Sequence, residues 1–240
     1  MKEIVKMARF DYHLARNTAF GGTLLLLAIS LLSSMFFSPL TSYYMIFNIG
    51  VCLVPVTSAE TKNGFEKMYG TLPVHRKSIV RGRFLYILIS SIAMEVTAIL
   101  ISALSIALNL NRFLVKKGGL MEAAELTFSF KQMPLYIIAA LVMFAFFSLL
   151  FSFNEMLGQI KGRGNDLRNI MIMLVVGIAI GMVYMKLAYD KEILPKVSEI
   201  QIPESVTESI VPFIAVNIII SAIIIIFGEI AANIVSKREL

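Results

Sequence analysis

Glu95 is the carboxylate that stands deepest within an apolar stretch of this sequence, so it is the first residue to consider for chemistry. It follows Arg83 by twelve residues, or roughly 18 Å at the rise of an α-helix. In a helix that crosses a bilayer, this depth is close to the midplane, where an ionised carboxylate costs at least about 2.5 kcal/mol. Three roles stay open for Glu95: lining a translocation cavity, a buried hydrogen-bonded structural role, and a contact between two copies of the chain.

Catalytic motifs do not accompany Glu95. The glycines Gly158, Gly162 and Gly164 only superficially resemble a phosphate-binding loop, because the Gly-Lys-Ser/Thr ending and the strand-loop-helix setting are missing. His13 and His75 stand apart from each other and from any nucleophile, and the single cysteine, Cys52, has no thiol partner. We therefore expect no catalytic residue, no metal site and no bound cofactor in this chain.

The composition indicates a membrane protein. Hydrophobic residues make up 58% of the 240 residues and charged residues only 16%, whereas about a quarter of a soluble protein is charged. The mean hydropathy is +0.79 and the pI is about 9.4. The basic residues are scattered between apolar runs and form no single face, so nucleic acid is not expected as a partner.

Six runs have the roughly 20 apolar residues that a helix needs to cross the bilayer. We predict an all-α fold with one membrane domain over residues 1–240, because no Pro-, Gly- or Ser-rich linker divides the chain. The predicted spans are residues 17–37, 41–59, 84–108, 133–153, 170–189 and 210–234.

The basic residues predict the orientation. Fifteen of the 22 lysines and arginines fall in the two termini and in the loops after spans two and four, and seven fall in the other loops. Because cytoplasmic loops carry the excess of Lys and Arg, both termini are expected in the cytoplasm of a cell-membrane protein.

The N-terminal segment has two compatible interpretations. Lys2, Lys6, Arg9, His13 and Arg16 follow one another at spacings of four and three residues, which on a helix makes one basic stripe. Val5, Ala8, Tyr12 and Ala15 repeat on another face. The pattern is typical of an amphipathic helix in the cytoplasmic headgroup region, and it is equally typical of a positive flank that orients the first span.

The polar stretch from Glu60 to Arg83 separates spans two and three. Phe65, Met68, Tyr69 and Leu72 follow the i, i+3, i+4, i+7 spacing of a helix with one apolar face. Pro73 is expected to end this short helix. Ser78 is expected to cap the next helix, and Arg81 and Arg83 are expected to extend towards lipid headgroups. The short helix either rests on the membrane surface or binds a soluble partner.

This stretch resembles a known family. Glu60, the run Gly64-Phe65-Glu66 and the run from Leu72-Pro73-Val74 to Arg83 are similar to the segment after span two in small ABC-2 type transporter permeases. The layout of a basic N-terminus and six spans is similar as well. Among these permeases, the chain looks most like those of bacterial exporters of amphipathic peptides, such as the phenol-soluble modulin exporter, and those of lantibiotic self-protection systems.

The resemblance implies a coupling helix that docks on a separate ABC ATPase subunit, where ATP and Mg²⁺ would bind. It implies a homodimer, or a heterodimer with a similar permease, that moves an amphipathic peptide or lipid-like cargo, with Glu95 in the candidate translocation cavity. The residues carried over for ATPase coupling are Glu60, Phe65, Glu66, Met68, Tyr69, Leu72, Pro73 and Arg76. Two other functions stay open: an immunity or sensor subunit that does not transport, and a stand-alone carrier that uses Glu95 to couple to ions or protons.

Overall fold

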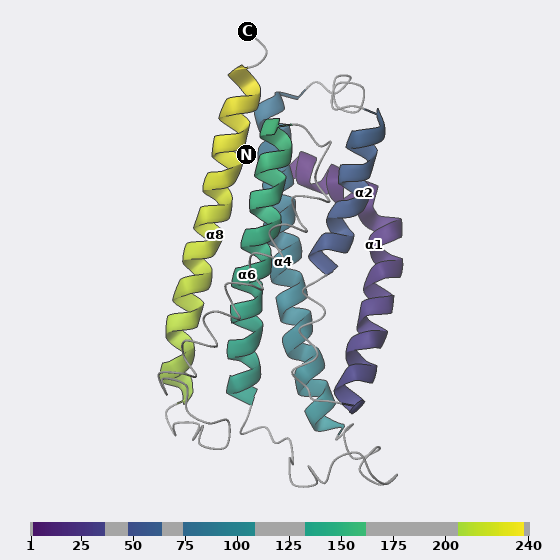
Figure 1. Cartoon of the computed structure of the whole chain (residues 1–240), viewed down its shortest axis with the longest axis vertical. Coiled ribbons are helices and arrows are strands. Elements are labelled where there is room, and N and C mark those ends of the chain that lie inside the picture. The colour runs from purple at the N-terminus through teal and green to yellow at the C-terminus, as the bar shows by residue number, and fades with distance from the viewer. Residues whose placement is uncertain (1, 37–47, 64–73, 109–132, 162–205, 238–240) are drawn as a thin grey trace, which may run out of the picture.

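The computed structural model describes residues 2–36, 48–63, 74–108, 133–161 and 206–237. Every element in these ranges is a helix, as the apolar runs predict. The five helices are α1 (Lys2–Phe36), α2 (Asn48–Asn63), α4 (Arg76–Ala107), α6 (Met133–Lys161) and α8 (Val206–Lys237). Figure 1 shows a bundle in which α4 and the second part of α1 run in one direction, while α2, α6 and α8 run in the opposite direction.

Helix α4 is the centre of the bundle, and it packs against α1, α2, α6 and α8. One apolar core joins α1, α2, α4 and α6 around Val56 and Ile87, whose side chains are fully buried. A second core joins α4, α6 and α8 around Phe84 and Ile224. Because α4 takes part in both cores, a displacement of α4 would disturb the packing of every other described helix.

Helix α1 has two parts of different direction. Its segments Lys2–Asn17 and Phe20–Leu32 meet at an angle of 67°, so the first part runs across one end of the bundle and the second part runs along it (Figure 1). The first part buries Met7, Ala8 and Ala15. The second part packs Leu27 and its neighbours against Ala98 and Ile101 of α4.

Three of the described helices are long and apolar enough to cross a membrane, and the bent α1 would make a fourth. Their outer faces expose large aliphatic side chains, such as Leu100 on α4 and Ile218 on α8, to 62% and 65%. Exposure of this extent suits contact with lipid tails. The six predicted spans are therefore supported in part, since the run 170–189 and residues 41–47 lie outside the described residues.

The helix ends differ from the predicted spans. Helix α4 begins at Arg76 instead of residue 84, and α6 continues to Lys161 instead of ending at residue 153. The added turns carry charged and amide side chains that end an apolar run in the sequence but are buried in the bundle, including Arg83, Glu155 and Gln159. These turns form the site described next.

Candidate functional site: a buried ion cluster

Arg83 is the centre of a buried ion cluster. Its Nε atom donates to Asp11 Oδ2 at 2.6 Å, and its Nη1 atom donates to Glu60 Oε2 and Glu155 Oε1, both at 3.1 Å. Only 1% of the Arg83 side chain is exposed, and the three carboxylate side chains are exposed by 8% or less. Gln159 completes the group, since its Nε2 donates to Glu155 at 3.0 Å and to Glu60 at 3.4 Å.

Each acid of the cluster comes from a different helix. Asp11 lies on the first part of α1, Glu60 near the end of α2 and Glu155 near the end of α6, while Arg83 lies in the second turn of α4. A planar guanidinium presents several donors in a fixed arrangement, so one arginine can serve carboxylates on three sides. The cluster therefore joins four helices at one end of the bundle.

The Glu60–Arg83 pair also defines a loop. Glu60 lies four residues before the segment 64–73, and Arg83 lies ten residues after it. The ion pair brings the end of α2 and the start of α4 together at the two ends of this segment. A movement imposed on the segment would therefore act on a closed loop whose ends are fixed to α1 and α6.

Close backbone packing holds α1 beside α4 around the cluster. A Cβ atom added to Gly82 would lie 2.5 Å from Met7 Cβ and 3.0 Å from the carbonyl oxygen of Ile4. One turn earlier, Ser78 Oγ donates to Glu3 Oε2 at 3.0 Å. The absence of a side chain at Gly82 lets α1 approach closely enough for Asp11 to reach Arg83.

A second ion pair joins α4 to α8 on the other side. Arg81 Nη2 donates to Glu229 Oε2 at 2.6 Å, and the two side chains are 35% and 44% exposed. Screening by solvent makes this pair weak compared with the buried cluster. Its position two residues from Arg83 means that the start of α4 is bound to each of the other four described helices.

Comparison with protein-family models gives one match: the ABC-2 family transporter protein model covers residues 11–228. The matched range contains every member of the ion cluster. This chain belongs to the ABC-2 transporter family. Searches of curated proteins and of solved structures returned no significant match. Membership makes the chain a multi-pass membrane protein and a permease subunit of an ABC transporter, whose partner is an ABC ATPase.

The structure corrects three sequence-based expectations for this ABC-2 permease. Arg83 does not extend to headgroups, because it is buried among carboxylates. Arg81 is half-buried and bound to Glu229 instead of reaching outwards. Ser78 does not cap the helix, since α4 begins at Arg76 after His75, without a side-chain cap, and the Ser78 hydroxyl is bound to Glu3.

The other coupling residues are only partly located. Glu60 is buried in the ion cluster and Arg76 is the first residue of α4. The remaining predicted coupling residues lie outside the part of the chain that the structure describes: Phe65, Glu66, Met68, Tyr69, Leu72 and Pro73. Their role stays a prediction.

Glu95 lies partly buried on α4, away from the ion cluster. Its Oε1 atom is buried without a hydrogen-bond partner among the described residues.

The register between α4 and α8 gives the depth of Glu95. Phe84 of α4 contacts Gly228 of the antiparallel α8. Eleven residues after Phe84 is Glu95, and eleven residues before Gly228 is Asn217. Asn217 donates to the carbonyl oxygens of Leu141 and Phe213, while its own Oδ1 is also buried without a partner. By this register, Glu95 and Asn217 lie at about the same depth on α4 and α8.

Two features of the sequence point to the ion cluster, although the apolar runs around them are more prominent. Asp11 shares a helical face with Ala8 and Ala15, both buried, so an acid stands within a buried stripe. Glu155 and Gln159 are spaced as i and i+4 on α6, which puts them on one face. The ion pairs of Arg83 cannot be predicted from local spacing, because 72 residues separate Arg83 from both Asp11 and Glu155.

Proposed function

We propose that this permease subunit belongs to an exporter and that the Arg83 cluster is the joint through which the ATPase moves the membrane helices. The observation that supports this proposal best is the Glu60–Arg83 ion pair, which holds together the two ends of the segment expected to bind the ATPase. For the segment 64–73, the spacing of Phe65, Met68, Tyr69 and Leu72 predicts a helix with one apolar face. Burial of each large apolar side chain would contribute on the order of 1.5–3 kcal/mol to docking.

The proposed motion follows from the contacts of Arg83. Closure of the ATPase on ATP moves the docked segment, and the segment moves Glu60 on α2 and Arg83 on α4 together. Because Arg83 also binds Asp11 and Glu155, α1 and α6 follow α2 and α4 as one rigid unit. A flexible loop would absorb the same displacement, whereas a loop closed by a buried ion cluster transmits it.

The remaining parts of the proposal rest on the sequence and the family. ATP and Mg²⁺ bind the ATPase subunit, and this chain performs no hydrolysis. Two copies, or one copy and a similar permease, form the transport path, since few spans are available in one chain. Both termini lie in the cytoplasm, Glu95 lines the translocation cavity, and the cargo is an amphipathic peptide or lipid-like molecule.

Affinity purification from the native membrane tests the docking. We expect an ABC ATPase to co-purify with the tagged permease in about equal amounts. The triple substitution Phe65→Asp, Met68→Asp and Tyr69→Asp should remove the ATPase, because it places charges on the apolar face. The matched control, Phe65→Leu, Met68→Leu and Tyr69→Phe, should retain it. Wild-type yield of ATPase with the triple aspartate variant would show that docking occurs elsewhere.

The same purification separates the proposed function from the two alternatives. An immunity or sensor subunit, or a carrier that couples to ions or protons, would be recovered without a stoichiometric ATPase. Recovery of the wild-type protein without an ATPase would overturn the proposed role.

A further inference from the structure

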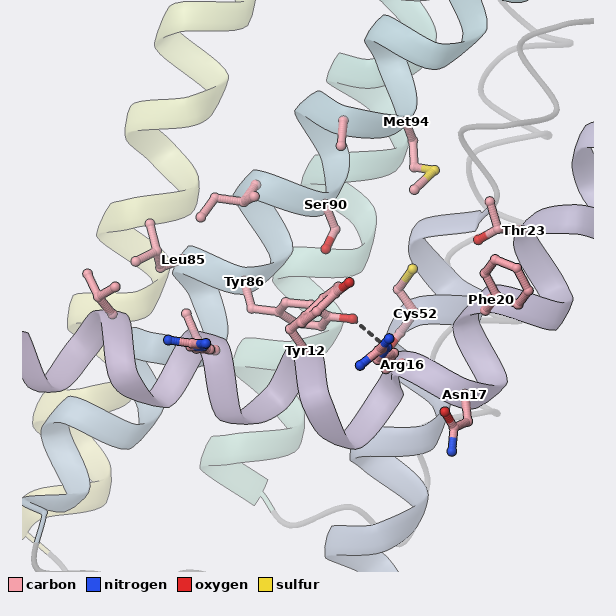
Figure 2. Close-up of a pocket in the computed structure, with 15 residues that line it drawn as sticks. Tyr12, Arg16, Asn17, Phe20, Thr23, Cys52, Leu85, Tyr86, Ser90 and Met94 are labelled. Atoms are coloured by element: carbon pink, nitrogen blue, oxygen red, sulfur yellow. Dashed lines mark hydrogen bonds between the residues drawn. The ribbon is translucent and has the colours of Figure 1, made fainter.

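A large cavity lies beside the bend of α1, lined by residues of α1, α2 and α4. Its volume is about 920 Å³, within the usual range for ligand pockets. Figure 2 shows the first part of α1 crossing the cavity, with Tyr12 and Phe20 on α1 and Tyr86 and Met94 on α4. Tyr86 donates its hydroxyl to the carbonyl oxygen of Cys52 at 3.2 Å, which fixes the wall where α2 meets α4.

Two arginines of α1 give the lining of the cavity a positive charge. Arg9, Arg16 and Asn17 line it from the first part of α1, while Phe20 and Ile89 line the remainder. Arg9 and Arg16 are seven residues apart, so they lie on one side of the helix about two turns from each other. Both are exposed, and the Arg9 Nε donates to His13 at 3.4 Å.

The acids of this part of α1 do not neutralise the cavity. Asp11 is bound to Arg83 and Glu3 accepts from Ser78, and neither residue lines the cavity. The lining therefore combines two arginines and several neutral polar side chains with apolar side chains. This combination complements a ligand that carries a negative headgroup and a hydrocarbon tail.

The cavity is large enough to hold an acyl chain. A volume of 920 Å³ corresponds to about thirty water molecules at their share of liquid volume. Phe20 and Ile89, which are 67% and 55% exposed, offer apolar surface to a ligand at the level where α1 turns to run along the bundle. Contact with hydrocarbon is more favourable for such surfaces than contact with water, so an acyl chain suits this part of the cavity.

We propose that this cavity binds an anionic phospholipid from the leaflet at this end of the bundle. Its phosphate lies beside Arg9 and Arg16, and one acyl chain lies along Phe20, Ile89 and Ala93. The lipid is a resident of the protein and not its cargo. It fills the angle of 67° between the two parts of α1 and so supports the segment that carries Asp11 to Arg83. Binding at this site does not require the chain to act in transport.

The experiment measures retained lipid. Purified full-length protein is reconstituted into vesicles of equal phosphatidylglycerol and phosphatidylcholine, extracted again in mild detergent, and analysed for lipid per protein by mass spectrometry. Wild-type protein should retain phosphatidylglycerol in excess over phosphatidylcholine. Removal of both charges with Arg9→Gln and Arg16→Gln should weaken retention by about fivefold for each arginine.

Matched variants separate a site from general surface charge. Lys2→Gln with Lys6→Gln removes two exposed charges from the same helix outside the cavity and should leave retention unchanged. Arg9→Lys with Arg16→Lys should retain the lipid. Ala93→Phe, which places a larger side chain in the lining of the cavity, should reduce retention of phosphatidylglycerol without removing any charge.

Three results would overturn the proposal. One is equal retention of the two lipids by wild-type protein, and another is equal loss in the Lys2/Lys6 and Arg9/Arg16 variants. The third is wild-type protein that carries no lipid, which would leave the cavity to another amphiphile such as a cargo peptide.

Discussion

Glu60 and Arg83 form a buried ion pair at 3.1 Å although they lie on different helices, at opposite ends of a polar stretch of the chain. The same arginine binds Asp11 and Glu155. In an ABC-2 permease subunit, this relationship ties the expected ATPase-docking segment to four helices at once.

Arg83→Gln should lower the free energy of unfolding by about 3–5 kcal/mol, because it leaves buried carboxylates without their cation. Arg83→Lys should cost less, since lysine keeps the charge but lacks the fork that serves three acids. Thermal unfolding of the purified protein in detergent measures both. The account would be contradicted by an Arg83→Gln protein as stable as the wild type.

The combined variant Asp11→Asn, Glu60→Gln, Arg83→Gln and Glu155→Gln should recover a large part of the stability lost in Arg83→Gln alone. Neutral amides keep hydrogen-bonding groups of similar shape without leaving unpaired charge. The same unfolding measurement applies. If the combined variant were less stable than Arg83→Gln, the loss in the single variant could not be attributed to the buried carboxylates.

Gly82→Ala should destabilise the protein by about 1–3 kcal/mol, the usual cost of overpacking. The new Cβ would lie 2.5 Å from Met7 Cβ and 3.0 Å from the backbone oxygen of Ile4, so α1 would have to move away. Gly21→Ala is the matched control on α1, because nothing lies within 4 Å of its added Cβ. That control should be neutral or stabilise by up to about 1 kcal/mol through helix propensity. Equal effects of the two substitutions would show that the α1–α4 contact is not tight.

Glu95→Gln should raise the unfolding temperature, because an ionised carboxylate within a membrane helix costs at least about 2.5 kcal/mol and an amide costs less. Glu229→Gln serves as the comparison, since Glu229 is half-exposed and paired with Arg81, and it should lower stability by at most about 1 kcal/mol. A marked loss of stability in Glu95→Gln would assign Glu95 a structural role and remove the case for a translocation cavity.

Much of the helix placement could be predicted from the sequence, because apolar runs of about 20 residues have few stable alternatives to a membrane helix. Helices α4, α6 and α8 contain the predicted spans almost completely. Their ends could not be placed, because the prediction ends each span where polar or charged residues follow an apolar run. Arg83 and Glu155 show that a charge at the end of an apolar run can be buried by a partner on another helix.

The ion cluster was harder to predict than the helices, because its charged residues are buried by partners that lie far away in the sequence. The family resemblance points to Glu60, whereas the position of its partner Arg83 beside a predicted span favours the membrane surface. Long-range pairing between Arg83 and Asp11 depends on the close approach of α1 at Gly82, and the local sequence does not encode that approach in a recognisable pattern. Arginine beside a predicted span is usually a headgroup contact, so a single sequence favours the wrong environment.

The most direct test of the joint is the distance between spin labels at Lys6 on α1 and Lys62 on α2, both exposed, in a protein whose Cys52 is replaced by Ser. Pulsed electron paramagnetic resonance would compare the complex with its ATPase in the nucleotide-free and ATP-bound states. If Arg83 binds α1 and α2 into one unit, the wild-type distance distribution is narrow and the same in both states. In Arg83→Gln the distribution broadens and shifts on ATP binding. A wild-type distance that changes with ATP, or an Arg83→Gln distribution as narrow as the wild type, would contradict the account.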